Sequence, residues 1–244
     1  MLKVAWFAVF LGLALCCSPA HRRPSAIPEV RVWGALRSIM HEGKTGPNVS
    51  LSNVAGPHVY GVGALTGLRG EVLLVDGAVF TSRAHGGDLA IHRSTTGTAT
   101  LLVAATVPAW TNVPISSPIA AEELDNRLEA LARANGLDVE KAFPVVIDGV
   151  VDVEWHVLDG SNVAGRGTHA DHMRNAVTGT ISGIQATVVG FFSKHHQGVF
   201  THMGQHTHFH VLTADHKIMG HVDRLAVRAG GTLKLPTVGA PPRR

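Results

Sequence analysis

The stretch HTHFHVLTADHKIMGH, residues 206–221, carries five histidines in sixteen positions and decides how the surrounding sequence is interpreted. Alternate residues of a β-strand share one face and lie roughly 6.6 Å apart. His206, His208 and His210 are therefore expected on the same face of one strand. Residues 214–217 are polar, and residues 218–225 return to a strand pattern. The stretch predicts a β-hairpin, and a β-rich fold around it.

This hairpin is also a candidate metal site. If its turn centres between Asp215 and His216, His210 lies opposite His221, and facing residues have Cβ atoms about 4.5–5.5 Å apart. Two histidines from one strand and a third from its neighbour can then bind one ion, and a zinc site with three protein ligands leaves a position for water or substrate. A solvated polar strand is the alternative. Eight of the sixteen histidines fall within residues 195–221, which favours Zn²⁺ or another divalent metal.

Composition narrows the class of protein. The chain has 244 residues, of which 45% are hydrophobic and 16% charged, as in a globular protein with a sizeable core. The formal net charge is only +3, and the basic residues are scattered along the chain. Without a basic face, nucleic acid is not an expected partner.

Residues 1–20 resemble a secretory signal peptide. Lys3 precedes an apolar run over residues 4–17, and small residues follow at 18–20. The run is too short to span a membrane, so no stable span is expected after cleavage. Cys16 and Cys17, the two cysteines, lie within it; a lipoprotein is the less favoured alternative, because Leu15 precedes them. A secreted or periplasmic chain without cysteine would hold metal through His, Asp or Glu.

Residues 21–30 are expected to form a linker, residues 31–235 the folded domain, and residues 236–244 a flexible tail. The domain could divide into two β-rich subdomains, at about 31–140 and 141–235. We expect short and long helices over residues 32–40 and 118–134, the second capped by Ser117. Tight hairpins are expected at Asp76-Gly77 and Asp148-Gly149. Further strands are expected over residues 98–107, 178–192 and 207–227. The fold class is therefore α+β: β-rich, with mixed or antiparallel sheets and few helices.

Two segments carry a resemblance to a known family. GQHTHFHVLTADHKIMGHV, residues 204–222, and GVGALTGLRGEV, residues 61–72, resemble the metal hairpin and the G-x-G…G-E segment of the α-acetolactate decarboxylases. WGALRSIMHEG and FPVVIDG are weaker matches, and together the matches cover about residues 31–225. The chain is identified as a divergent member of this family. The resemblance implies a carbon–carbon lyase that decarboxylates α-acetolactate, or a related 2-hydroxy-3-keto acid, to acetoin and CO₂.

The resemblance also implies a ligand set: a His-x-His pair, a third histidine eleven residues on, and a glutamate. His208, His210 and His221 keep this spacing and the turn, whereas His206 and His208 keep the register from Gly204. We prefer the first set, because the turn and cross-strand pairing determine which residues meet in a hairpin. The glutamate corresponds to Glu71, which we assign as a metal ligand and a catalytic residue.

The sequence departs from the family pattern at two places. The family arginine that follows the I-D-G segment is absent from VVDVEWHVLDG, residues 150–160, where His156 is the nearest substitute and our second catalytic candidate. The family glutamate near the C-terminus is also absent, because no glutamate follows Glu154, and Asp223 is a candidate for its place. These losses leave open a non-catalytic, His-rich periplasmic metal-binding protein. The assembly state stays open too, with a homodimer as one arrangement.

Overall fold

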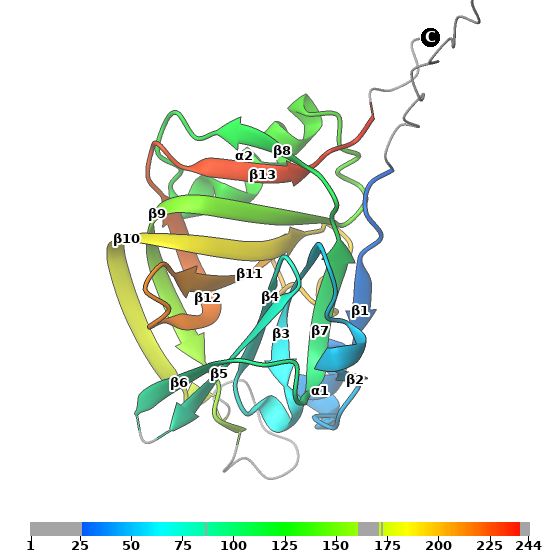
Figure 1. The fold of residues 1–244 in the computed structure, drawn as a ribbon, viewed down its shortest axis with the longest axis vertical. Coiled ribbons are helices and arrows are strands. Elements are labelled where there is room, and N and C mark those ends of the chain that lie inside the picture. Colours follow the sequence, from blue (N-terminus) through cyan, green and yellow to red (C-terminus); the bar gives the residue numbers. More distant parts are fainter. Residues whose placement is uncertain (1–25, 86, 161–170, 172, 240–244) are drawn as a thin grey trace, which may run out of the picture.

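A computed structural model describes residues 26–85, 87–160, 171 and 173–239 of the chain. The expected signal peptide, residues 21–25 of the linker and residues 240–244 of the tail lie outside the described residues. Two antiparallel sheets make up most of the fold, and the helices are few (Figure 1). The predicted class, a β-rich α+β fold, is confirmed. Within the described residues, no helix has the length and apolar character needed to cross a membrane.

The first sheet has strand order β1-β7-β3-β4-β5-β6, with β2 paired to β7. All its pairings are antiparallel. The strands are β1 (Arg31–Trp33), β2 (Val49–Ser50), β3 (Val59–Leu65), β4 (Glu71–Val75), β5 (Ala78–His85), β6 (Asp88–Arg93) and β7 (Thr98–Thr106).

The second sheet has strand order β10-β11-β12-β9-β13-β8. Because β10 also pairs with β9, the pairings of β9, β10, β11 and β12 close into a cycle. Closure leaves these four strands little freedom to shift in register. The strands are β8 (Trp110–Pro114), β9 (Phe143–Val157), β10 (Val177–Phe192), β11 (Thr207–Thr213), β12 (Met219–Val227) and β13 (Thr232–Pro236).

Both expected helices exist, but each begins later than predicted. Helix α1 is Leu36–Glu42, because residues 31–33 pair with β7 instead; it ends at Gly43, with φ of 68°. Helix α2 is Leu124–Ala134, preceded by a 3-10 turn, Ala121–Glu123. Two further 3-10 turns are Leu51–Asn53 and Thr66–Leu68. The cap predicted at Ser117 is wrong, because Ile119 exchanges backbone hydrogen bonds with Val227 and holds this segment extended.

The two predicted Asp-Gly hairpins had different outcomes. Asp76 and Gly77 have positive φ, at 47° and 82°, and join β4 to β5 as predicted. The hairpin at Asp148-Gly149 is wrong: β9 runs straight through it. Asp148 pairs with neighbours on both sides, and its carboxylate lies 2.6 Å from Nζ of Lys234. Asp148 is therefore a polar residue within a central strand, and no turn forms at Asp148-Gly149.

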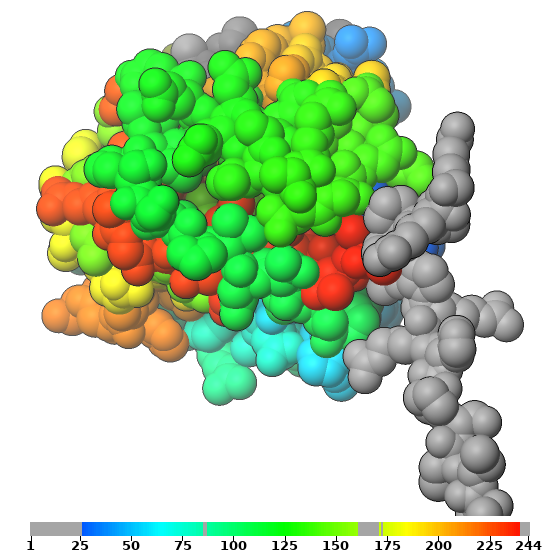
Figure 2. Space-filling view, turned by 90° about the horizontal axis from the view of Figure 1, so that it is seen from above, coloured from blue at the N-terminus to red at the C-terminus, as the bar shows by residue number. Residues whose placement is uncertain are grey.

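The two sheets share a core. Residues of the first sheet, such as Val62, Leu73 and Val103, pack with Val189, Phe191 and Met219 of the second. Helix α2 buries Leu124 and Leu128 in a separate cluster against the second sheet. The segment that contains β8 and α2, with β13, forms the face of the molecule seen in Figure 2. The division into subdomains near residue 140 stays a prediction.

Candidate metal centre

The hairpin of β11 and β12 forms as predicted, and its turn sets the register. His216 has φ of 57°, and Oδ1 of Asp215 accepts hydrogen bonds from the Thr213 hydroxyl at 2.7 Å and the Lys217 N–H at 3.1 Å. These contacts close the turn, as short polar side chains commonly do. The turn places His210 directly opposite His221, as the sequence predicts.

A row of histidines crosses three neighbouring strands. His210 on β11 pairs with His221 on β12, and His221 in turn pairs with His156 on β9. Directly paired residues in a sheet present their side chains on the same face. A close approach of β12 to β9 is needed here: a Cβ at Gly220 would lie 2.6 Å from the carbonyl oxygen of His156.

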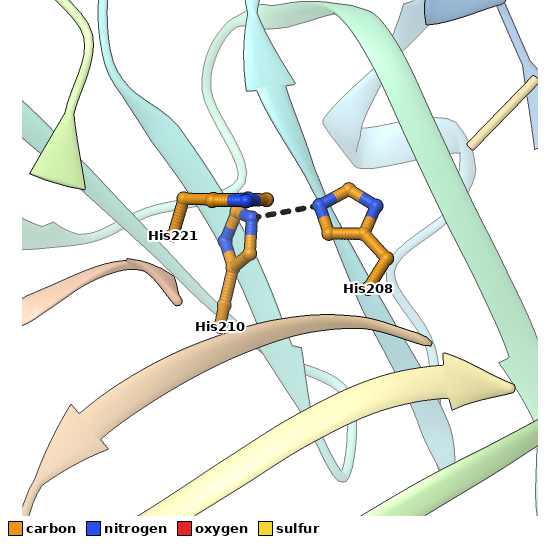
Figure 3. A group of neighbouring side chains, drawn as sticks. All are labelled: His208, His210 and His221. Carbon is orange, nitrogen blue, oxygen red and sulfur yellow. Dashed lines mark hydrogen bonds between the residues drawn. The ribbon is translucent and has the colours of Figure 1, made fainter. Parts of the chain in front are cut away.

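His208 joins this row from the same face of β11. Nitrogen atoms of His208, His210 and His221 all lie within 4.8 Å of one another, and Nε2 of His208 lies 3.3 Å from Nε2 of His210. Figure 3 shows the three rings turned toward one point. All three side chains are buried. The structure thus brings together the preferred histidine set, and these residues could hold a metal ion.

Glu71 reaches the histidines from the other sheet. It begins β4, is 2% exposed, and its Oε2 lies 3.8 Å from Nε2 of His210. Oε1 of Glu71 accepts a hydrogen bond from the N–H of Leu158, just after β9, at 3.2 Å. One carboxylate oxygen is thereby held by the opposite sheet, while the other faces the imidazoles.

Burial sets the charge state of these groups. Burial lowers the pKa of His208 to about 3, and the charge of His202 adds to the effect. The pKa values of His210 and His221 also lie well below 6.5, first through burial and then through neighbouring imidazoles. Burial raises the pKa of Glu71 to about 7, against the opposing effects of His156 and the Leu158 N–H. Three neutral imidazoles therefore present lone pairs, beside a carboxyl group that ionises near neutral pH.

His156 lies beside the histidine trio and is paired with an aspartate. Its Nδ1–H donates to the two carboxylate oxygens of Asp223, at 2.8 and 2.9 Å. Asp223 is the extra residue of an irregularity in β12, where the register shifts between Val222 and Arg224. Such a bulge redirects a side chain. Burial alone would lower the pKa of His156, but the Asp223 hydrogen bond and the charges of Glu71 and Asp223 outweigh burial and raise it.

The other histidines of this region have different positions. His206 precedes β11, its backbone N–H donates to Asp125, and it is not in the trio. His195 pairs with Glu140, and His196 with Ser193. His202 lies close to the centre, with its ring centroid 5.6 Å from that of His221. No periodicity marks His202 in the sequence, because it follows a turn outside any strand.

His208, His221 and Glu71 line a small cavity of about 40 Å³, together with His156, His202 and apolar residues that include Leu68 and Leu158. Such a volume accommodates one or two water molecules. Three imidazole nitrogens and one carboxylate in a buried setting form the donor set that divalent metals such as zinc take in catalytic sites. Fold and site together define a β-rich protein with a buried candidate metal centre between two sheets.

Comparison with known proteins places this chain in a family. Residues 35–238 match the family described as Alpha-acetolactate decarboxylase. The chain belongs to the α-acetolactate decarboxylase family, as its two sequence segments predict. A search of curated protein sequences found no significant match.

Solved structures show the same fold. The acetolactate decarboxylase of Bacillus subtilis subspecies spizizenii is 15% identical, with 85% of each chain covered and a TM-score of 0.70. That of Bacillus subtilis strain 168 is 14% identical, with 84% of this chain and 85% of that chain covered and a TM-score of 0.66. A Staphylococcus aureus protein of unknown function, similar to α-acetolactate decarboxylase, is 16% identical, with 84% of each covered and a TM-score of 0.66.

Proposed function

We propose that this protein is a metal-dependent carboxy-lyase that converts α-acetolactate, or a related 2-hydroxy-3-keto acid, to acetoin and CO₂. The observation that carries the proposal is the buried trio His208, His210 and His221 with Glu71 facing it, in a member of this family. His208, His210, His221 and Glu71 would hold the metal, with Zn²⁺ as the first choice of ion.

The residues around the trio have separate roles in this proposal. A divalent cation at this position would act as a Lewis acid on the substrate's ketone and hydroxyl oxygens. Loss of CO₂ from a carboxylate leaves a carbon that must take up one proton. Glu71 faces this position from the opposite sheet and is proposed to pass that proton to the carbon inside the cavity. His156, oriented by Asp223, lines the same cavity and is proposed to contact the substrate there, in the segment where the family arginine is absent.

Acetoin formation by the purified protein loaded with Zn²⁺ tests the proposal. The double variant His208→Ala, His210→Ala should lose metal and nearly all acetoin formation, because two of the four proposed ligands are gone. A double variant of exposed histidines, His92→Ala with His195→Ala, is the matched control and should keep both. Metal content is measured by elemental analysis alongside the rate. Absence of metal-dependent CO₂ release from any 2-hydroxy-3-keto acid would contradict the proposal.

The alternative, a non-catalytic metal-binding protein, predicts a different titration. Such a protein would bind more than one ion and would keep its affinity in Glu71→Ala. The observed trio is enclosed between two sheets with a carboxylate facing it, and the neighbouring group of His156, His221 and Asp223 shares His221 with the trio, which favours one ion over two. One ion per chain, bound more weakly by Glu71→Ala, would support the enzyme. The proposed location is outside the cytoplasm, since residues 1–20 have the pattern of a signal peptide.

A further inference from the structure

The cavity at the metal centre is too small for the proposed substrate. At about 40 Å³ it holds a water molecule or two, whereas a five-carbon acid needs several times that space. Part of the acid must therefore lie outside this inner cavity. The position of that part decides which residues recognise the substrate.

A second pocket adjoins the inner cavity. It has a volume of about 290 Å³, and Leu36, Met40 and His202 line both spaces. This outer pocket lies between α1 and the loop that precedes β11. Its size approaches that of ordinary small-molecule sites. The outer pocket can thus take the remainder of a molecule whose oxygens reach the histidines.

The outer pocket is lined by one arginine, Arg37, and by no carboxylate among the described residues. Arg37 is exposed on the first turn of α1, and within the described chain the arginine ion pairs are those of Arg133, Arg174, Arg224 and Arg228. Arg37 is held in place through its backbone, because its N–H donates to the Gly198 carbonyl at 2.8 Å. A Cβ added at Gly198 would lie 3.8 Å from Nε of Arg37, so the Arg37 side chain lies against the turn at Gly198.

We propose that Arg37 binds the carboxylate of the substrate in the outer pocket and so takes the part of the missing family arginine from a different element. The inference rests on the proposed function. A guanidinium without an acidic partner can form two parallel hydrogen bonds to a carboxylate. The methyl groups of the acid would lie against Leu36 and Met40, which line the passage to the histidines.

Binding of a non-reactive pair of ligands tests this role without turnover. The acid 2,3-dihydroxy-2-methylbutanoate and its neutral amide keep the same hydroxyl groups, and calorimetry gives their affinities for the zinc-loaded protein. The wild type should prefer the acid. Arg37→Gln should weaken binding of the acid about tenfold to a hundredfold and leave the affinity for the amide unchanged. A hydrogen bond to a charged group contributes about this much to affinity. Arg37→Lys should restore part of the preference, because lysine keeps the charge but not the planar fork.

Arg127→Gln is the matched control: Arg127 is exposed on α2 and lines neither space. It should bind both ligands as the wild type does. With α-acetolactate, Arg37→Gln should raise KM without lowering kcat, because it removes a contact to the ground-state carboxylate, whose negative charge is lost as CO₂ forms. An unchanged acid preference in Arg37→Gln, or none in the wild type, would overturn the inference. If the wild type binds the acid through Arg37 but forms no acetoin, only the proposed reaction fails.

Discussion

Asp223 shows how one carboxylate can act on the site from outside the cavity. Its side chain is 39% exposed, yet both its oxygens contact the 5%-exposed His156. Because Nδ1 of His156 is engaged by this carboxylate, the ring is fixed and its other nitrogen is free to face the cavity that His156 lines. Partners that orient a functional histidine in this way commonly matter nearly as much as the histidine itself.

Asp223→Asn should lower kcat/KM for α-acetolactate about tenfold to a hundredfold, the range found for groups that orient the histidines of metal sites. The reason is that His156 loses the negative charge that stabilises its protonated form. Steady-state kinetics, with metal content measured on the same samples, checks the effect. Asp88→Asn, an exposed change of the same kind on β6, should have no effect. Equal kinetics for the two variants would show that the His156–Asp223 pair has no part in the reaction.

At the scale of elements, the position of the histidines depends on how closely β10 and β11 approach. Gly190 on β10 pairs with Phe209, which lies between the two histidines of β11. A Cβ at Gly190 would lie 2.2 Å from both the carbonyl oxygen of His208 and Cδ1 of Phe209. Backbone and ring cannot both give way, so a side chain there must displace β11.

Gly190→Ala should therefore destabilise the fold by about 1–3 kcal/mol, as overpacking of a core does, and should also weaken zinc binding. Urea denaturation of the metal-free protein and a zinc titration measure the two effects. Gly46→Ala is the matched control, because no atom lies within 4 Å of the added Cβ. Wild-type stability and zinc affinity in Gly190→Ala would mean that the β10–β11 spacing does not position His208 and His210.

Elements with a clear period in sequence could be predicted, and those fixed by distant partners could not. The hairpin of β11 and β12 shows alternating histidines and a polar turn, so even the pairing of His210 with His221 could be predicted from the sequence. The straight path of β9 through Asp148-Gly149 depends on pairing with β10 and β13, which are remote in sequence. The position of His202 beside His221 could not be predicted for a similar reason, since only the packing of a loop brings the two rings together.

For the molecule as a whole, the buried candidate centre lowers the folding stability of the metal-free protein. The two sheets enclose three imidazoles that cannot take up protons and one carboxyl group that resists ionisation. An unfolded chain has no such restrictions, and its histidines ionise near pH 6.5. Folding is thus linked to pH through the same residues that are proposed to bind the ion.

The metal-free protein should lose stability as the pH falls from about 6.5 to 4.5. In this window the unfolded chain takes up three protons, on His208, His210 and His221, that the folded chain excludes, because the pKa values of these histidines are lowered by folding. Glu71 acts in the opposite direction: its pKa is raised to about 7, so the folded chain holds one proton more. The net difference of two protons gives a slope of about 2.7 kcal/mol per pH unit.

Urea denaturation of the metal-free protein at several pH values between 7 and 5 measures this slope. His210→Gln should reduce it by about 1.4 kcal/mol per pH unit, the contribution of one proton. His92→Gln, an exposed change, should leave it as in the wild type. A stability that does not fall below pH 6.5, or a His210→Gln slope equal to that of the wild type, would show that the trio is not held neutral in the folded protein, and would remove the electrostatic basis for a buried cation site.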